Sequence, residues 1–316
     1  MVEVLPALEF ETVCWGKAMG YGISSFAVLK MLAIDGSLSD IKQVVDLGAQ
    51  EIHMSEGDRI SHPFRTVIRE LCLTLGGPDL SSEEVDSLAA RASAGDLFER
   101  LNIRYKSLDT NALYGEPFDL NFGKVSDEDR GAYCLTMNSG TTEHLFDQEN
   151  AFRVAHDLTR VGGLMIHSVP FVGNIDHGFF NYNPNLFSQL ALQNSYELLG
   201  MWVTGRGEEL FEWNEHSARH FSYLGYICSP NNGGGLFLTC VLRKVHAGDF
   251  CIPFQASYEH MVEIGALERY QVNFDGKMIS AAEMRQIREK ENLRYLSGRA
   301  LMRELGKRFM RRISLR

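Results

Sequence analysis

Side chains that could do acid–base chemistry are densest in the segment "MIHSVPFVGNIDHGFFNYNP", residues 165–184. The segment begins in a predicted strand, and the loop that follows a strand of an α/β sheet covers the ligand site. His177 is the preferred general base, because a neutral imidazole accepts a proton near pH 7, and Asp176 would orient its ring. Tyr182 is a further catalytic candidate. The alternative is a loop that its own hydrogen bonds hold in place.

His144 is the second histidine that could take part in catalysis. It follows Glu143 in the segment "SGTTEH", residues 139–144, after another predicted strand. One interpretation places His144 beside the reacting atoms. The other is that Glu143 and His144 fix the loop and the first helical turn after it. The sequence leaves both open.

A metal site is the remaining chemistry that these histidines suggest. His167, Asp176 and His177 could supply ligands, but their spacing does not match a zinc motif. We therefore expect no metal site.

The segment "VVDLGAQEI", residues 44–52, resembles the start of a nucleotide-binding strand. Asp46 and Gly48 stand where such a strand ends, and a glycine there lets a backbone turn tightly. The second and third glycines of the usual loop are missing, and Gln50 stands in that region instead. A single Asp-x-Gly is weak evidence, because ordinary buried strands also end in glycine.

These candidates must be positioned by elements that alternate along the chain. The predicted strands are "IKQVVDLG", "NIRYKSLD", "AYCLTMN", "LMIHSVP", "ELLGMWVTG" and "GGLFLTCVLRKV". Helices are predicted within residues 17–33, in "QENAFRVAHDLTRVGG" with Gly162 and Gly163 as its stop, and in "NPNLFSQLALQNSY". Strands that alternate with helices indicate an α/β fold with a mainly parallel sheet.

Residues 53–103 are too long for a simple crossover between two strands. They hold three amphipathic helical segments, of which one begins with a capping box at Ser81 and Glu84. We expect them to form a helical cap over the site.

The motifs together resemble the class I S-adenosylmethionine-dependent methyltransferases over residues 40–245. The matching parts are Asp46-Leu47-Gly48 at the first strand end, Asp109 at the second, "SGTTEH" after a later strand, and Arg160-Val161-Gly162-Gly163 before the next. The chain is similar to bacterial members that act on small molecules or glycans, with an altered glycine-rich motif. The resemblance implies a Rossmann-like, doubly wound, mainly parallel seven-stranded sheet.

The resemblance also implies S-adenosylmethionine as cofactor and methyl transfer to an oxygen or nitrogen of a small-molecule or glycan-like acceptor. An aspartate at the second strand end, Asp109, would accept hydrogen bonds from the ribose hydroxyls. Gly48 would mark the tightest point of the turn beside Asp46, and Gln50 and Glu51 would contact the methionine end of the cofactor. His144 would lie near the sulfonium or the acceptor.

Four more residues are candidates for contact with this cofactor. Asp119, in "PFDLNF", would contact the adenine or hold a loop. Asn138 and Ser139 end a strand at the cofactor face. Tyr21, between two glycines, would close over the cofactor, or else pack as an aromatic residue at a helix start.

Two rival functions remain open at this point. The altered turn is compatible with an enzyme that cyclises or cleaves S-adenosylmethionine instead of transferring its methyl group. A methyltransferase fold can also serve as a binding protein without activity.

Composition and charge set the remaining expectations. The chain has 316 residues, a net charge of −10 and six cysteines without a CxxC pair. With no apolar run near the roughly 20 residues that span a membrane, and acids near the start, we expect a cytoplasmic protein. An acidic body is a poor partner for nucleic acid.

The expected domains are a helical segment at residues 1–40, a methyltransferase domain at 41–245 with the insertion at 53–103, and an extension at 246–316. Residues 284–316 contain eleven Lys and Arg against three Glu. The apolar residues of this segment have near-helical spacing with arginines between them, which predicts a basic helix. This helix could bind an anionic membrane surface, form a homodimer contact, or dock on the acidic body of its own chain.

Overall fold

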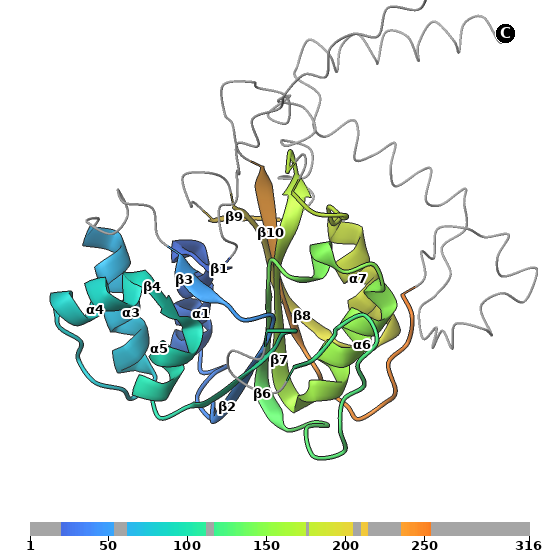
Figure 1. Ribbon diagram of the computed structural model, residues 1–316, viewed down its shortest axis with the longest axis horizontal. Coiled ribbons are helices and arrows are strands. Elements are labelled where there is room, and N and C mark those ends of the chain that lie inside the picture. The colour runs from blue at the N-terminus through green and yellow to red at the C-terminus, as the bar shows by residue number, and fades with distance from the viewer. Residues whose placement is uncertain are drawn as a thin grey trace, which may run out of the picture. The chain divides into compact units, whose positions relative to one another are not determined.

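The computed structural model describes residues 20–53, 62–111, 117–174, 177–204, 210–213 and 235–253 (Figure 1). Strands and helices alternate through these residues, which confirms the predicted α/β class. The predicted basic helix and most of the predicted extension lie outside the described residues, so they stay predictions. No helix in the described ranges is long and apolar enough to cross a membrane.

The main sheet has seven strands in the order β5-β2-β6-β7-β10-β8-β9. They are β2 (Gln43–Leu47), β5 (Arg104–Leu108), β6 (Tyr133–Ser139), β7 (Thr159–Val172), β8 (Glu197–Thr204), β9 (Leu210–Glu212) and β10 (Leu236–Arg243). β5, β2, β6 and β7 pair in parallel, whereas β10 runs antiparallel between β7 and β8, and β9 is antiparallel to β8. The mainly parallel seven-stranded sheet is thus confirmed.

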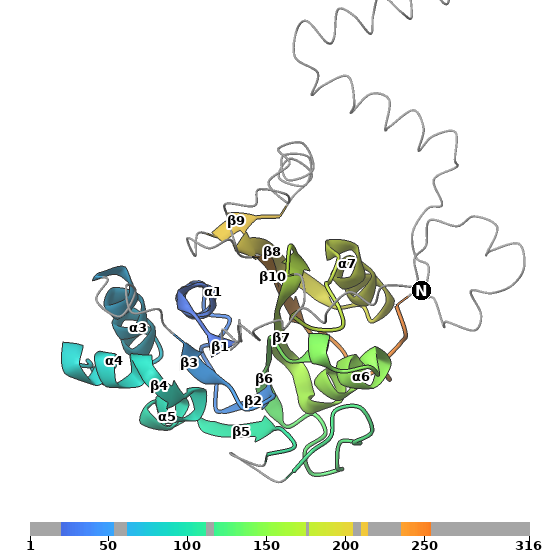
Figure 2. The ribbon, with the colours of Figure 1, turned by 45° about the horizontal axis from the view of Figure 1, so that its top comes forward.

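Helices cover both faces of this sheet, as Figure 2 shows. One layer holds α1 (Ile23–Ile34), α3 (His62–Thr74), α4 (Ser82–Ala89) and α5 (Ala94–Arg100), and the other holds α6 (Gln148–Leu158) and α7 (Pro184–Gln193). Every residue of β6 is buried, because a parallel strand in a doubly wound sheet has a layer on each side. Alternate residues of β2 serve the two layers: Val44 packs with the α1 layer, and Val45 packs with the α6 layer.

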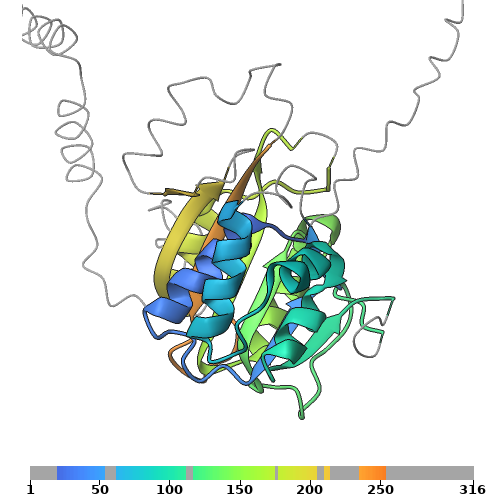
Figure 3. The same cartoon turned by 90° about the vertical axis from the view of Figure 1, so that its left-hand side faces the viewer.

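The described part of the insertion contains the three predicted helices, which pack as a layer on the sheet and not as the expected cap over the site. α3, α4 and α5 share one hydrophobic cluster with α1 and the sheet, so they are a layer of the fold (Figure 3). A small sheet that the sequence pattern did not predict has the strand order β1-β3-β4, and the insertion contributes β4 and the last residue of β3 to it. Its strands are β1 (Gly20–Tyr21), β3 (Glu51–His53) and β4 (Ala90–Ser93). Its middle strand, β3, directly follows the turn at the end of β2.

Two local predictions have different outcomes. The capping box of α4 is confirmed, since the Glu84 amide donates to Ser81 Oγ at 3.2 Å and the Ser81 amide donates to Glu84 Oε2 at 2.8 Å. The stop of α6 at Gly162 and Gly163 is wrong: the helix ends at Leu158, and β7 already begins at Thr159. Thr159 is the C-cap residue: its amide makes the last helical bond, to the Ala155 carbonyl, which its hydroxyl also contacts, and its own backbone is already extended, with a ψ of 126°.

Candidate active site at the carboxyl edge of the sheet

The candidate site lies where the chain leaves β2 and β6 in opposite directions. The connection after β2 runs to β5 on one side, and the connection after β6 runs through α6 to β7 on the other. In open α/β sheets the crevice at such a point, outside the carboxyl ends of the strands, is where ligands bind. Gly48, Asp109 and Thr141 follow the three strands that end there.

The turn after β2 is held together from within. Gly48 has a φ of +87°, a conformation that L-residues with side chains rarely adopt. Its amide donates to the Leu108 carbonyl at 2.8 Å. The next amide, of Ala49, donates to Asp109 Oδ2 at 2.9 Å. The structure therefore brings the predicted Asp109 to the predicted turn.

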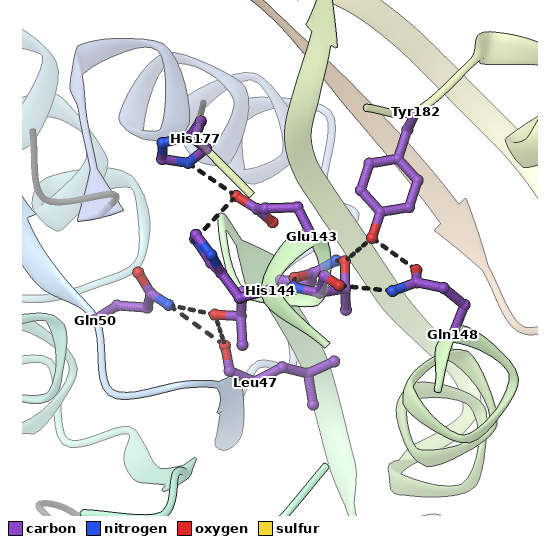
Figure 4. Close-up of polar contacts among 10 residues, drawn as sticks. Leu47, Gln50, Glu143, His144, Gln148, His177 and Tyr182 are labelled. Atoms are coloured by element: carbon purple, nitrogen blue, oxygen red, sulfur yellow. Dashed lines mark hydrogen bonds and ion pairs between the residues drawn. The ribbon is translucent and has the colours of Figure 1, made fainter. Parts of the chain in front are cut away.

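The space above Gly48 is filled by a threonine. A Cβ at position 48 would lie 2.4 Å from Thr141 Oγ1, so only glycine fits. The Thr141 hydroxyl donates to the Leu47 carbonyl at 2.6 Å and accepts from Gln50 Nε2 at 2.9 Å (Figure 4). Gln50 is only 5% exposed, and its Oε1 has no hydrogen-bond partner within the described part of the chain. A buried acceptor is thus available for a ligand at this turn.

Asp109 is partly buried at the end of β5. Its second oxygen, Oδ1, accepts from the Asn111 amide at 3.1 Å and lies 3.4 Å from the Thr110 hydroxyl. A carboxylate oxygen has two lone pairs, so Oδ2, which accepts from the Ala49 amide, can still accept a bond from a ligand.

Asp46 lies below the turn, inside the protein. It is fully buried, and the hydroxyls of Tyr21 and Tyr105 donate to its two oxygens at 2.6 Å each. Burial raises the pKa of Asp46 to about 7, although the two tyrosine bonds lower it. Of the two roles expected for Tyr21, the structure therefore shows the packed aromatic residue and not the residue that closes over the cofactor.

Asn138 and Tyr182 belong to a buried network on the α6 side of the sheet. Asn138 Nδ2 bonds to Thr142 Oγ1 at 2.9 Å and lies 3.1 Å from His167 Nδ1, and its Oδ1 accepts from the Thr142 amide. The Tyr182 hydroxyl bonds to Thr142 Oγ1 at 3.0 Å and to Gln148 Oε1 at 2.7 Å (Figure 4). Burial raises the pKa of Tyr182 and lowers that of His167 to about 4. These groups position the segment that carries Thr142.

The other two predicted cofactor residues lie apart from this network. Asp119 is exposed, and its Oδ1 accepts from the Asn121 amide at 2.8 Å, which holds a surface loop. Ser139 is buried at the end of β6, and its hydroxyl has no hydrogen-bond partner among the described residues.

Glu143, His144 and His177 come together at the carboxyl ends of β6 and β7, and we call them the Glu-His-His cluster. Glu143 Oε1 lies 3.4 Å from His177 Nε2 and 3.9 Å from His144 Nε2, and the two rings are 5.1 Å apart between centroids (Figure 4). Glu143 is fully buried, whereas the side chains of His177 and His144 are 23% and 46% exposed. The two histidines that compete as sequence candidates are therefore neighbours.

Burial controls the charges of this cluster. It raises the pKa of Glu143 to about 7 and lowers the pKa of His177. Burial also lowers the pKa of His144, and the nearby His177 adds to the effect. Both imidazoles are thus held neutral near pH 7, as a base or a metal ligand must be.

The backbone fixes the segment after β7 against Glu143. The Phe179 amide donates to the Glu143 carbonyl at 2.8 Å. A Cβ at Gly178 would lie 2.9 Å from Glu143 Cγ, so glycine allows the close approach. Asp176, the expected orienting residue, lies outside the described residues. The sequence pattern assigns Glu143 only to fixing the loop, and its place directly before His144 is the one signal that marks it.

Comparisons with known proteins give only distant likenesses. No family model matches the chain, and neither does any curated protein. Among solved structures, the chain is similar to a SAM-dependent methyltransferase from Archaeoglobus fulgidus, with 13% identity and a TM-score of 0.34 over 69% of this chain and 93% of that one. It is also similar to a loganic acid methyltransferase with SAH, at 8% identity and a TM-score of 0.38 over 71% and 92% of the two chains. A geranyl diphosphate methyltransferase in complex with SAM has 10% identity and a TM-score of 0.35 over 70% and 86%.

Proposed function

We propose that this protein binds S-adenosylmethionine at the carboxyl ends of β2 and β5 and transfers its methyl group to an oxygen or nitrogen of a small-molecule or glycan-like acceptor. The observation that carries the proposal is the junction of Asp109 with the glycine turn, through the Ala49 amide. A carboxylate at the end of the second strand, beside a tight turn at the end of the first, is suited to a ribose diol.

The same turn argues against a cofactor with phosphates. A pyrophosphate is bound by free backbone amides at the N-terminus of a helix. Here the amides of Gly48 and Ala49 already donate within the protein, and the chain continues into β3, not into a helix. S-adenosylmethionine has an adenosine ribose but no phosphate, so it suits this arrangement. The buried Oε1 of Gln50 is an acceptor for the ammonium group of its methionine end.

The acceptor side of the reaction adjoins this cofactor side. Thr141 covers Gly48, and Glu143 and His144 follow it in one short 3₁₀ helix, Thr142–His144. A methyl group held over the turn would therefore face the Glu-His-His cluster. The bound cofactor supplies an activated methyl on a positively charged sulfur. The protein aligns the acceptor with it and keeps neutral imidazoles nearby.

The first experiment measures S-adenosylhomocysteine binding by calorimetry, with NAD as a comparator that carries phosphates. We expect binding of S-adenosylhomocysteine and none of NAD. Asp109→Asn should weaken this binding roughly 10–100-fold, because a charged acceptor is lost while an oxygen remains for the Ala49 amide.

The matched control is Asp35→Asn. Asp35 is exposed, and its Oδ1 accepts from the Ser37 amide at 2.8 Å in the loop after α1. This control should bind S-adenosylhomocysteine as the parent does. Equal affinity of a folded Asp109→Asn variant would remove Asp109 from the site, and tight NAD binding would overturn the choice of cofactor.

The second experiment follows the fate of the methyl group. The protein is incubated with methyl-labelled S-adenosylmethionine and a library of hydroxylated and amine acceptors, and products are detected by mass. Methylated acceptors support the proposal. Cyclised or cleaved cofactor without methylated acceptor indicates the rival enzyme, and cofactor binding without any product indicates a binding protein.

A further inference from the structure

We propose that the Glu-His-His cluster binds a divalent first-row transition-metal ion. Within the described part of the chain, Glu143, His144 and His177 form the group whose candidate ligand atoms all lie within 4.8 Å of one another. Two imidazoles and one carboxylate are a ligand set for Zn²⁺, Fe²⁺, Co²⁺ or Mn²⁺, and a poor one for Mg²⁺ or Ca²⁺, which prefer oxygen ligands.

The distances are already close to those of a loaded site. With metal–ligand bonds of about 2.0–2.2 Å, two ligands of one ion lie roughly 3–3.6 Å apart. Glu143 Oε1 is 3.4 Å from His177 Nε2 and 3.9 Å from His144 Nε2. Small side-chain rotations would bring all three atoms around one ion. Figure 4 shows that both rings turn a nitrogen toward the carboxyl group.

The buried carboxyl group of Glu143 is the second and independent observation. It is fully buried, yet neither of its oxygens has a hydrogen-bond partner among the described residues. His177 Nε2 is likewise buried and without such a bond. A buried polar group without a partner costs free energy. A cation between Glu143 and the two imidazoles would satisfy these atoms together.

The site would keep coordination positions open on one side. Glu143 closes the inner side, whereas the partly exposed His177 and His144 stand toward solvent. Three protein ligands with open positions are typical of catalytic metals, and structural zinc usually has four. An ion here would hold an oxygen of a bound molecule.

The assignment of that oxygen to the methyl acceptor rests on the proposed function. Because the cluster directly follows Thr141, which covers the cofactor turn, an acceptor hydroxyl on the ion would lie beside the methyl group. The ion would orient this hydroxyl and make its proton easier to lose, and the proton would pass to water on the open side of the site as the new oxygen–carbon bond forms. His144 and His177 would then act as ligands, and neither would be the general base.

The test is metal binding by the full-length protein, without turnover. The protein is stripped with a chelator, and Co²⁺ is titrated while the visible absorption is recorded. Zn²⁺ binding is measured by calorimetry, with Mg²⁺ as the comparator. We expect about one Co²⁺ or Zn²⁺ per chain and no comparable binding of Mg²⁺. Electron spin-echo spectroscopy of bound Mn²⁺ should detect nitrogen from imidazole.

Variants assign the ion to the cluster. His177→Ala and Glu143→Gln should each weaken Co²⁺ binding at least 10-fold, because each removes one of three ligands. His246→Ala is the control, since His246 is an exposed histidine after β10 and not part of the cluster. It should bind Co²⁺ normally. If Glu143→Gln does not fold, His144→Ala gives the same test at a half-exposed position.

The outcomes separate the metal site from the proposed function. Absence of Co²⁺ and Zn²⁺ binding by the folded protein would overturn the metal site, and so would unchanged affinity in His177→Ala. The cluster would then be a Glu–His pair without an ion. Metal binding without S-adenosylhomocysteine binding would support the site and reject the proposed function. Binding of S-adenosylhomocysteine without binding of Co²⁺ or Zn²⁺ would support the proposed function and overturn the metal site.

Discussion

Gly48 and Gly36 have nearly the same backbone conformation, with φ values of +87° and +83°, in different surroundings. A Cβ at Gly48 would strike the Thr141 hydroxyl, whereas a Cβ at Gly36 would meet no atom within 4 Å. The two positions therefore separate two reasons for a glycine. Both have a positive φ that would strain another residue, but only Gly48 of the two is also approached closely by another side chain, that of Thr141.

Gly36→Ala should destabilise the protein by about 1–2 kcal/mol through strain at positive φ. Gly48→Ala should cost roughly 1–3 kcal/mol more, because Thr141 must move and the turn opens. Urea unfolding of both variants gives the two values. Equal destabilisation would mean that Thr141 moves aside at no cost.

Asp46 makes the free energy of unfolding depend on pH, in a direction that its raised pKa determines. Its pKa in the folded protein is about 7, above the value of about 3.9 for an unfolded chain. The folded state therefore binds the proton more tightly. The resulting stability is fully present below about pH 4 and is lost as the pH rises to about 7.

Asparagine does not titrate, so Asp46→Asn removes this contribution to the pH dependence of stability. The drop in the free energy of unfolding between pH 5 and pH 8 should be smaller in the variant than in the parent, by roughly 2–3 kcal/mol. Urea unfolding at the two pH values provides the measurement. An identical pH dependence would show that the carboxyl group of Asp46 does not titrate in this range.

At the scale of elements, a buried lysine joins the end of α6 to β7 and β10. Lys244 follows β10, and its Nζ donates to the His156 carbonyl in the last turn of α6 at 2.8 Å. Its backbone pairs with Gly162 and Gly163 of β7 at 2.7 and 3.0 Å. Burial lowers the pKa of Lys244, while Asp157 raises it. A cation at a helix C-terminus stabilises the carbonyls that have no partner within the helix.

Lys244→Met keeps the apolar stem of the side chain and removes this bond. The free energy of unfolding should fall by about 1–3 kcal/mol, because a buried carbonyl loses its donor. Lys124→Met, at an exposed position, should change it by less than about 0.5 kcal/mol. Thermal and urea unfolding compare the two. Similar small effects would indicate that water replaces the lysine at the helix end.

At the scale of the molecule, one sheet supports two hydrophobic clusters. α1, α3, α4 and α5 pack on one face, and α6 and α7 pack on the other. Neither layer can leave without exposing a face of the same strands. The described residues should therefore unfold as one cooperative unit.

Two buried cysteines report on the two layers. Cys72 lies in α3 and belongs to the cluster of the α1 layer, and Cys240 lies in β10 and belongs to the cluster of the α6 layer; burial raises the pKa of both thiols. Pulse labelling in urea should modify both at the same midpoint, as resolved by peptide mass analysis. Cys251, which is partly exposed, should react in the folded protein. Different midpoints for Cys72 and Cys240 would mean that the layers unfold separately.

Periodicity and turn residues were enough to predict the α/β class, the mainly parallel sheet and the capping box of α4. These features depend on residues that are near one another in the sequence. The end of α6 was predicted wrongly at the glycines, because the backbone of Thr159 is already extended and pairs with Tyr133 of β6. The prediction that residues 53–103 form a cap over the site was wrong because it also depended on contacts between distant segments. The sequence predicted the apolar faces of α3, α4 and α5, but it did not predict which surface these faces pack against.

The sequence by itself determined that Asp46, Gly48 and Asp109 stand at strand ends and that His144 follows a strand after a short segment, which places them near one edge of a parallel sheet. Only the tertiary structure decided which of them meet. Asp109 docks on the turn, Asp46 is enclosed by two tyrosines, and Glu143 gathers two histidines from separate segments. The physical reason is that local periodicity fixes the face and end of a strand, whereas contacts between distant segments depend on strand order, register and packing.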